Sequence, residues 1–296
     1  MSDSDQIRAQ QNLQAIMQSP SYRLAERDIE LLAQPELRPV RMQLELLKPE
    51  LAFTRLGVAS TIVIFGSTQI VERPVAEQQL AQAEAALAAT PDDPYLARLV
   101  ARRRRVLAKC HYYDEARAFA RLVSTHCQQE SSCEYVVVTG GGPGIMEAAN
   151  RGAFDVGAKS IGLNITLPAE QVPNPYITPE LCFQFHYFAL RKLHFLLRAK
   201  ALVVFPGGFG TLDELFDALT LRQTNRMQQI PILMYGREYW EQVLDLEFLA
   251  DEGAIEDRHL QLVDYADTPE DAWQKIVAFY AAASPGESTT GSGARQ

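Results

Sequence analysis

The stretch that decides the fold reads ALVVFPGGFGTLDE and occupies residues 201–214. Residues 201–205 form a short, continuous apolar run, which predicts a buried strand. A turn containing three glycines follows directly, and Thr211 stands where a helix is predicted to begin. A buried strand that passes through a glycine turn into a helix is the opening half of a βαβ unit.

The same pattern recurs along the chain. Two further apolar runs end in glycine turns: residues 61–65 precede Gly66-Ser67, and residues 135–138 precede the turn at 140–144. Additional strands are predicted at 160–164, 181–185, 230–235 and 262–263. Helices are predicted at 75–123 with breaks near Pro91 and Pro94, from 144 onward, and at 187–199, 238–249 and 269–282. Continuous apolar strands that alternate with helices predict a Rossmann-like, doubly wound α/β fold: a parallel sheet with helices on both faces.

The two ends of the chain differ from this pattern. Residues 1–57 predict a helical extension, with a helix from Pro39 to about Leu56 that Pro49 interrupts. Residues 58–283 are expected to form the Rossmann-like domain. The tail, residues 284–296, is rich in glycine, serine and threonine and is predicted to be disordered.

Charge and composition argue against several classes of partner. The chain has 28 basic and 37 acidic residues, a formal net charge of −9, which disfavours nucleic acid and anionic membranes. The basic run at residues 102–105 has two interpretations, a helix face that is solvated or pairs with a partner's acids, and a polyanion site; we favour the first. The N-terminus lacks the pattern of a signal peptide, and no apolar run reaches about 18 residues, so a cytoplasmic protein is expected.

The four cysteines form no Cys-x-x-Cys pair. Cys127, Cys133 and His126 lie close enough in sequence to suggest a metal site, but no second histidine stands at helical spacing. Reduced thiols and the absence of a metal are therefore expected.

The glycine turns are expected to lie together. The carboxyl ends of parallel strands meet at one edge of a sheet, where ligands of such folds bind. Glycine lets the backbone approach an anion, and the N–H groups and dipole of the following helix favour negative charge. One such turn is equally consistent with tight packing, but two in one sheet predict a phosphate site.

Two common phosphate ligands fit the turns poorly. A dinucleotide fingerprint needs an acidic residue about 20 positions on, whereas the next predicted strand ends in Asn164. A Walker loop needs Gly-Lys-Ser/Thr, which follows neither turn. A mononucleotide held by both turns fits better.

Three charged residues lie near the second turn: Arg191, Lys192 and Glu214. In isolation, Arg191 and Lys192 would be assigned to a solvated helix face. Glu214 would be assigned to a helix start, or to a capping box with Thr211.

A family resemblance changes that assignment. Residues 206–214 match the PGGxGTxxE motif of the LOG ("Lonely guy") family, and Arg191-Lys192 matches its second motif at the right distance. Residues 140–147 resemble the family's first glycine loop, and Gly66-Ser67 resembles the turn after its first strand. The resemblance spans roughly residues 58–283. The chain departs from short members by its long N-terminus and by Glu147, which replaces a glycine.

The resemblance implies a phosphoribohydrolase, which converts a nucleoside 5′-monophosphate and water into free base and ribose 5-phosphate. It implies Arg191 and Glu214 as catalytic residues, and no metal or cofactor. The implied nucleotide- and phosphate-binding residues are Gly66, Ser67, Gly140, Gly141, Gly142, Gly144, Glu147, Asn164, Lys192, Gly207, Gly208, Gly210 and Thr211. Members have been labelled lysine decarboxylases, but no motif marks Lys192 or Lys200 as a Schiff-base lysine.

Two expectations remain. The alternative function is a non-catalytic nucleotide sensor or cofactor carrier of the same superfamily; Glu214 favours the enzyme, because a binder needs the glycine turns but not the acid. The resemblance also implies a homodimer or higher homo-oligomer. We expect its interface to include helices from residues 75–123, whose apolar positions recur at helical spacing: Leu96, Leu99, Val100, Val106 and Leu107.

Overall fold

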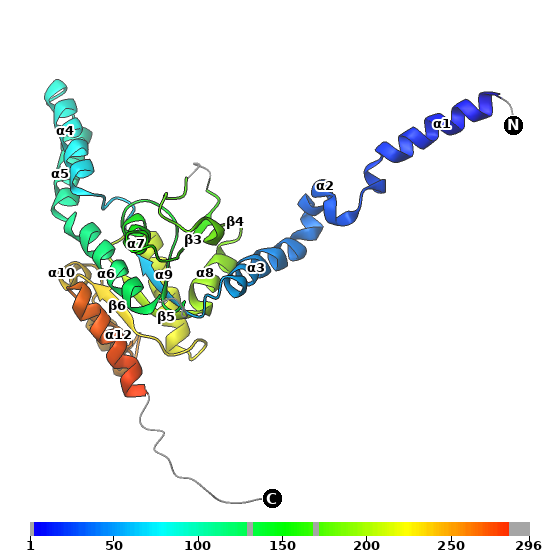
Figure 1. Cartoon of the computed structure of the whole chain (residues 1–296). Coiled ribbons are helices and arrows are strands. Elements are labelled where there is room, and N and C mark those ends of the chain that lie inside the picture. The colour runs from blue at the N-terminus through cyan, green and yellow to red at the C-terminus, as the bar shows by residue number, and fades with distance from the viewer. Residues whose placement is uncertain (1–2, 129–132, 168–171, 284–296) are drawn as a thin grey trace, which may run out of the picture. The chain divides into compact units, whose positions relative to one another are not determined.

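The computed structural model describes residues 3–128, 133–167 and 172–283, and Figure 1 shows the whole chain. Contacts divide it into two compact units, Met1–Lys48 and Pro49–Gln296. The division falls inside a helix, whereas the sequence analysis placed a boundary at 57/58. The predicted disorder of residues 284–296 lies outside the described residues.

The first unit is helical. It contains α1 (Asp3–Gln18), α2 (Ile29–Ala33) and the first part of α3 (Arg38–Arg55). The side chain of Asp28 caps α2 by accepting a hydrogen bond from the Leu31 N–H at 3.0 Å. The predicted interruption at Pro49 is wrong, because α3 continues through it. The Pro49 ring is buried, as are Ala52 and Phe53, and this packing offsets the backbone hydrogen bond that proline cannot donate.

The second unit contains a sheet of seven parallel strands in the order β4-β3-β2-β1-β5-β6-β7. The strands are β1 (Thr61–Phe65), β2 (Val136–Thr139), β3 (Ser160–Ile165), β4 (Cys182–Phe185), β5 (Ala199–Val204), β6 (Ile232–Tyr235) and β7 (Asp264–Ala266). This confirms the Rossmann-like α/β fold. The strand order reverses between β1 and β5, which is where ligands of such sheets bind.

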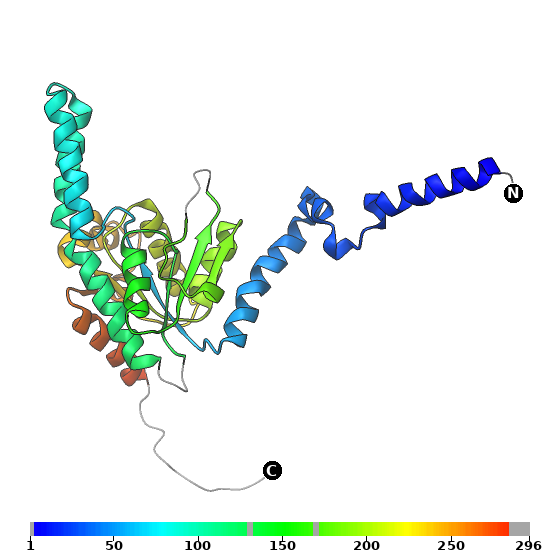
Figure 2. The same ribbon diagram turned by 45° about the horizontal axis from the view of Figure 1, so that its top comes forward.

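Helices cover both faces of the sheet (Figure 2). The helices that follow β1 are α4 (Arg73–Ala89), α5 (Pro94–Ala108), α6 (His111–Cys127), α7 (Ile145–Phe154), α8 (Phe188–Leu197), α9 (Phe209–Gln223), α10 (Arg237–Val243), α11 (Leu246–Asp251) and α12 (Pro269–Ala283). On one face, a core cluster joins side chains of α6, α7 and α12 to alternate strand residues such as Ile62 and Val203. On the other, Phe65 packs edge-on against Phe195 of α8, with ring centroids 4.8 Å apart.

Two helices that were predicted from the sequence are each divided into shorter helices in the structure. The long helical region consists of α4, α5 and α6, with the expected break at Pro91 and Pro94 and a further break at Lys109–Cys110 that the sequence analysis missed. The helix predicted at 238–249 is also two helices, because Asp245 caps the start of α11. Its side chain accepts a hydrogen bond from the Phe248 N–H at 2.9 Å, which stabilises a new helix start at that point.

Helices α4 and α5 form a hairpin that projects away from the sheet (Figures 1 and 2). They pack along each other, and Ala76 and Ala83 of α4 and Val100 of α5 are buried. The other apolar residues that the sequence analysis assigned to an interface, Leu96, Leu99, Val106 and Leu107, are half-buried. Much of their surface is therefore covered within the chain itself.

Candidate functional site

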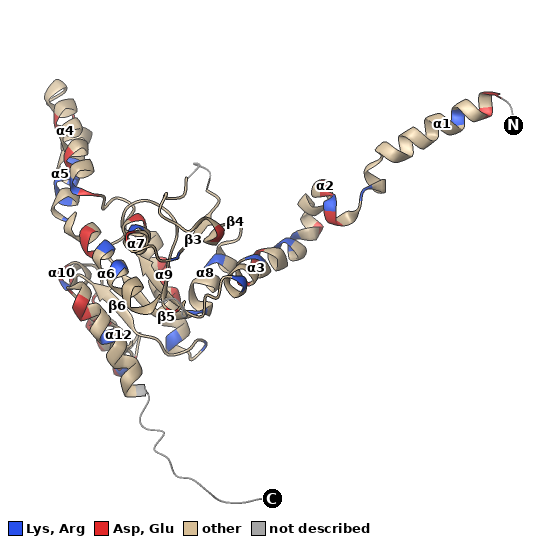
Figure 3. Cartoon of the chain, in the orientation of Figure 1, with Lys and Arg blue, Asp and Glu red and all other residues tan. Residues whose placement is uncertain are grey.

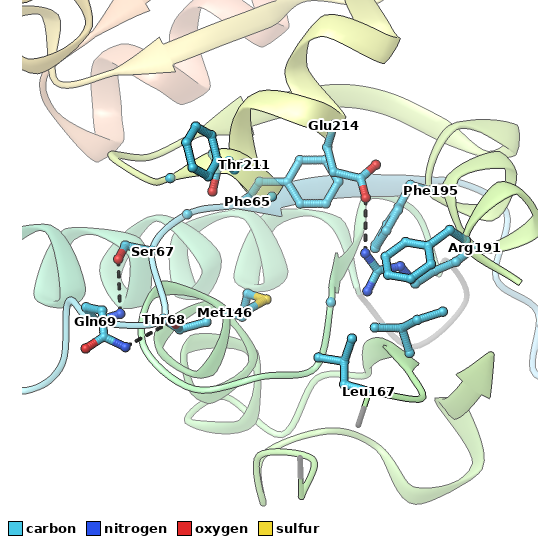
Figure 4. Close-up of a pocket in the computed structure, with 17 residues that line it drawn as sticks. Phe65, Ser67, Thr68, Gln69, Met146, Leu167, Arg191, Phe195, Thr211 and Glu214 are labelled. Atoms are coloured by element: carbon cyan, nitrogen blue, oxygen red, sulfur yellow. Dashed lines mark hydrogen bonds and ion pairs between the residues drawn. The ribbon is translucent and has the colours of Figure 1, made fainter. Parts of the chain in front are cut away.

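A cavity of about 440 Å³ lies beside the carboxyl ends of β1, β2 and β5 (Figure 4). Eight residues that the sequence analysis assigned to the site line it: Gly66, Ser67, Gly140, Arg191, Gly208, Gly210, Thr211 and Glu214. The three strand-end turns therefore contribute to one cavity, at the point where the strand order reverses.

The turns interlock through their backbones. The Ser67 N–H donates to the Pro206 carbonyl at 2.9 Å, and the Ile145 N–H donates to the Ser67 carbonyl at 3.1 Å. Gly144 has a φ of +73°, and a Cβ there would lie 2.4 Å from the Ser67 oxygen. Only glycine fits this position, so it allows the turn after β2 to pack against the turn after β1.

A buried amide cluster supports the turn after β2. The Thr139 hydroxyl donates to Asn150 Oδ1 at 2.7 Å and accepts from the Gly141 N–H at 3.0 Å. Asn174 Nδ2 donates to the Gly142 carbonyl at 3.1 Å and to Asn150 Oδ1 at 3.0 Å. Asn150 is fully buried, and its own amide donates to the Ile161 carbonyl at 3.3 Å. The sequence analysis missed this support, because its three side chains come from distant parts of the chain.

We expect Asn150→Leu to lower the free energy of unfolding by roughly 2–4 kcal/mol. The change keeps the branched shape and the number of heavy atoms of the side chain but removes hydrogen-bond partners from three buried groups. Urea denaturation measures the effect. Gln78→Leu is the matched control, since Gln78 is exposed on α4. A loss of less than 1 kcal/mol for Asn150→Leu would contradict a structural role for the cluster.

Arg191 of α8 and Glu214 of α9 form a buried ion pair in the cavity, with Nη2 to Oε1 at 3.2 Å. The Glu214 side chain is 7% exposed and that of Arg191 is 15% exposed. Arg191 also lies over the rings of Phe188 and Phe195, 5.2 and 5.5 Å from their centroids. These contacts hold the guanidinium against the carboxylate, so neither charged group is on a solvated helix face.

Burial dominates the ionisation of this pair. It raises the pKa of Glu214 to about 7, although the positive charges of Arg191 and Lys192 lower it. The same burial lowers the pKa of Arg191. The capping-box interpretation of Glu214 is wrong: the N-cap of α9 is Gly208, and no side chain caps this helix. Its first N–H groups therefore remain available to a ligand.

The remaining binding residues suggested by the sequence do not line the cavity. Lys192 forms an ion pair with Asp213 at 2.7 Å, and Glu147 accepts a hydrogen bond from the Tyr113 hydroxyl at 2.8 Å. Asn164 is buried and donates to Cys182 Sγ at 3.4 Å. Each of these polar groups has a partner inside the fold.

Four glycines also lie outside the lining: Gly141, Gly142, Gly144 and Gly207. Gly207 packs against Thr211, and its carbonyl accepts a hydrogen bond from the Tyr239 hydroxyl at 2.6 Å. These glycines shape the turns that the lining residues occupy.

The sequence analysis missed the apolar part of the cavity and two polar residues next to Ser67. These residues are Phe65, Thr68, Gln69, Met146, Ile165, Leu167, Phe188, Phe195 and Phe209. A signal was present for some of them. Phe188 and Phe195 stand three positions before and four positions after Arg191, which places all three on one helix face.

Three further findings concern the described residues only. No group of three or more histidine, cysteine, aspartate and glutamate side chains gathers there as a metal site. The four cysteines form no disulfide. Among the helices of the described ranges, none combines the length and apolar character that a bilayer crossing requires.

A protein-family model described as "Possible lysine decarboxylase" matches residues 146–276, a range that contains both Arg191 and Glu214. This family model describes a LOG-family domain, to which residues 146–276 are similar. No curated protein matches the chain significantly.

Solved structures resemble the chain at low identity. The molybdenum cofactor binding protein of Rippkaea orientalis is 19% identical, covers 57% of this chain and 88% of its own, and has a TM-score of 0.41. The Moco carrier protein of Chlamydomonas reinhardtii is 19% identical, covers 58% and 89%, and has a TM-score of 0.40. An X-ray structure of a structural-genomics target is 21% identical, covers 74% and 99%, and has a TM-score of 0.44.

Proposed function

We propose that this chain is a LOG-family enzyme that hydrolyses the N-glycosidic bond of nucleoside 5′-monophosphates to give free base and ribose 5-phosphate. The observation that carries this proposal is the buried Arg191–Glu214 pair, which shares one cavity with three strand-end turns. An anion-binding turn beside a buried carboxylate suits a phosphorylated sugar whose reaction develops positive charge.

The start of α9 is the proposed phosphate site. Its N-cap is Gly208, and the positive end of the helix dipole lies beside the cavity. A Cβ at Gly208 or Gly210 would meet no atom within 4 Å, so there is space beside this backbone. Thr211 is nearly buried and supplies a hydroxyl at the same helix start.

Glu214 and Arg191 are the proposed catalytic residues. As the C1′–N bond breaks, positive charge develops on the ribose, and the Glu214 carboxylate stabilises it. Glu214 also orients a water molecule, whose oxygen forms the new bond to C1′. Of the two hydrogens of this water, one stays on the new hydroxyl group and the other balances the proton that the departing base takes up. Arg191 fixes the position of the Glu214 carboxylate through their ion pair.

The apolar residues give the cavity a second region suited to a base. Phe188, Phe195, Ile165 and Leu167 line it and carry no hydrogen-bonding side chain. Aromatic and aliphatic surfaces of this kind pack against the flat faces of a purine or pyrimidine.

Decarboxylation of lysine fits the cavity poorly. Pyridoxal enzymes bind their cofactor through a Schiff-base lysine. The cavity lining contains no lysine among the described residues. Lys192 is held by Asp213 at 2.7 Å, and the Lys200 ammonium lies 5.6 Å from the Tyr280 ring centroid. Neither is placed to form such a bond in this site.

Incubation with AMP and chromatographic detection of adenine tests the proposal. A panel of the common nucleoside monophosphates then identifies the preferred base. Tight nucleotide binding without base release from any member of the panel would point instead to the sensor or carrier alternative.

We expect kcat/KM to rise with pH through about 7, because the proposed mechanism needs the ionised form of Glu214. The stability of the fold should change in the opposite direction and fall as the pH rises. A carboxyl whose pKa is raised on folding contributes stability below its unfolded value of about 4.5, and that stability is lost as pH rises through about 7. Urea denaturation at pH 5 and pH 8 measures this loss, which should be absent in Glu214→Gln. A flat rate profile between pH 5 and pH 8 would contradict the assignment.

A further inference from the structure

A second cavity lies at the opposite edge of the sheet from the candidate site. It has a volume of about 180 Å³ and is bounded by the residues where β6 and β7 begin, whereas the candidate site lies at the carboxyl ends of strands. The last turn of α9 and part of α12 complete its walls. Its apolar lining consists of Pro231, Ile232, Leu233, Leu262, Val263 and Phe279. We call it the Arg222 cavity, after the buried residue at its wall.

Arg222 has hydrogen-bonding capacity that the fold does not use. Among the described residues it is the only lysine or arginine that is buried, with 9% of its surface exposed. Its Nε donates to Gln229 Oε1 at 3.0 Å, and its Nη1 donates to the Leu262 carbonyl. A guanidinium has five N–H donors, and Nη2 finds no acceptor among the described residues. Because Arg222 lines the cavity, the unused donors are available to a ligand there.

The positive charge of Arg222 also lacks a full counter-charge. Within residues 3–128, 133–167 and 172–283, no carboxylate lies within 4 Å of its guanidinium. The carboxyl end of α9 supplies only about half a negative charge, and the Phe279 ring centroid lies 5.9 Å away. Burial lowers the pKa of Arg222, which reflects the cost of keeping this charge out of water. Arg191, by contrast, is paired with the Glu214 carboxylate at 3.2 Å. Buried charges in proteins are normally paired in this way, so Arg222 lacks the partner that a carboxylate ligand supplies.

The other charged residues of the Arg222 cavity already neutralise one another. Lys275 pairs with Asp264 at 3.6 Å and with Asp271 at 3.2 Å, and it also donates to the Tyr265 carbonyl. Acidic residues gather in the first turn of α12 (Figure 3). Because these acids offset Lys275, Arg222 is the source of the uncompensated positive charge. An anion with a single negative charge therefore suits the cavity better than a doubly charged one such as phosphate.

We propose that the Arg222 cavity binds a small monocarboxylate. Its carboxylate pairs with the Arg222 guanidinium, whose planar arrangement of N–H groups matches the two oxygens of a carboxylate. Its hydrocarbon part packs against the apolar lining. Sites for drug-sized ligands have volumes of about 300–1,000 Å³, so this smaller cavity suits an acid of only a few carbons. The site is separate from the candidate active site and does not depend on the proposed hydrolase activity.

Butyrate is the probe, and the wild-type chain tests the charge and the shape of the ligand first. Calorimetry should give a Kd on the order of 1 mM for butyrate. Butyramide, which has the same shape without the charge, should bind about tenfold more weakly or worse. Acetate, which has less hydrocarbon, and inorganic phosphate should also bind more weakly than butyrate. Butyramide that binds as tightly as butyrate, phosphate that binds more tightly, or undetectable butyrate binding at about 10 mM would overturn the proposal.

Arg222→Met removes the guanidinium charge and keeps an unbranched side chain. The affinity for butyrate should fall about 10–100-fold, because a hydrogen-bonded charge pair is lost. Arg226→Met is the matched control, since Arg226 is exposed and lies outside this cavity. It should keep the wild-type affinity, and circular dichroism should show that both variants are folded. A folded Arg222→Met chain with wild-type affinity, or an equal loss in the control, contradicts the assignment.

The location of the ligand can be measured on a chain that keeps Arg222, so this test does not depend on the folding of the Arg222 variant. In spectra of the chain with labelled isoleucine methyl groups, butyrate should shift the signal of Ile232, which lines the Arg222 cavity. It should leave the signal of Ile165, which lines the candidate site, unchanged. The variants Ile232→Val and Ile165→Val identify the two signals. A shift of Ile165 without a shift of Ile232 would place butyrate in the candidate site and overturn the proposal.

Discussion

Glu214→Gln is expected to lower the rate of base release about 10²–10⁴-fold, the contribution typical of a positioned acid–base group. The substitution removes the charge that would stabilise the ribose but keeps the size of the side chain. Nucleotide affinity should change little, because the proposed phosphate contacts come from the start of α9. Single-turnover release of adenine from AMP measures the rate, and calorimetry measures the affinity.

Asp213→Asn is the matched control for this substitution. Asp213 is adjacent in sequence, but its side chain is half-exposed and pairs with Lys192 outside the cavity. Its rate should stay within a few-fold of wild type. A Glu214→Gln enzyme that releases base at the wild-type rate would remove Glu214 from the mechanism.

Adenosine is expected to react with a kcat/KM about 10²-fold below that of AMP. A hydrogen bond to a charged group contributes about 1.5–3 kcal/mol, and a factor of ten in rate corresponds to about 1.4 kcal/mol. Loss of one or two contacts at the start of α9 therefore accounts for a factor of this size. Initial rates with both substrates measure it.

Thr211→Val provides the control for the location of the phosphate. It removes one hydroxyl donor and keeps the shape of the helix start, so it should slow AMP hydrolysis and leave adenosine hydrolysis nearly unchanged. Adenosine that reacts within a few-fold of AMP in the wild-type enzyme would contradict the phosphate role of this turn.

Most of the fold was predictable from local patterns. The strands that precede Gly66, Gly140 and Gly207 each contain a continuous run of buried apolar residues, and buried parallel strands commonly leave that pattern in a sequence. The helix through Pro49 was not predictable in the same way, because the burial that compensates for a proline depends on the three-dimensional packing. The break between α5 and α6 was not predicted either, because residues 109–110 include no proline or glycine to mark it.

The candidate site was predictable for those residues that belong to a recognised sequence motif. Arg191 and Glu214 stand 23 positions apart, and the resemblance brought them together before the structure did. Lys192 and Glu147 show the limit of this reasoning. Each belongs to a motif, yet each side chain pairs with a group outside the cavity, Asp213 and Tyr113 respectively. Such pairs join distant elements, and no local pattern marks them.

The position of β1 has a consequence for how the protein matures. This strand pairs with β2 on one side and with β5 on the other, so one of its neighbours is synthesised long after it. The cavity needs Thr211 and Glu214 as well as the turn after β1, and it cannot exist in a nascent chain that ends before them. A ligand of this cavity binds only a chain that has folded from β1 through the start of α9, so by mass action it stabilises that whole folded region rather than one loop.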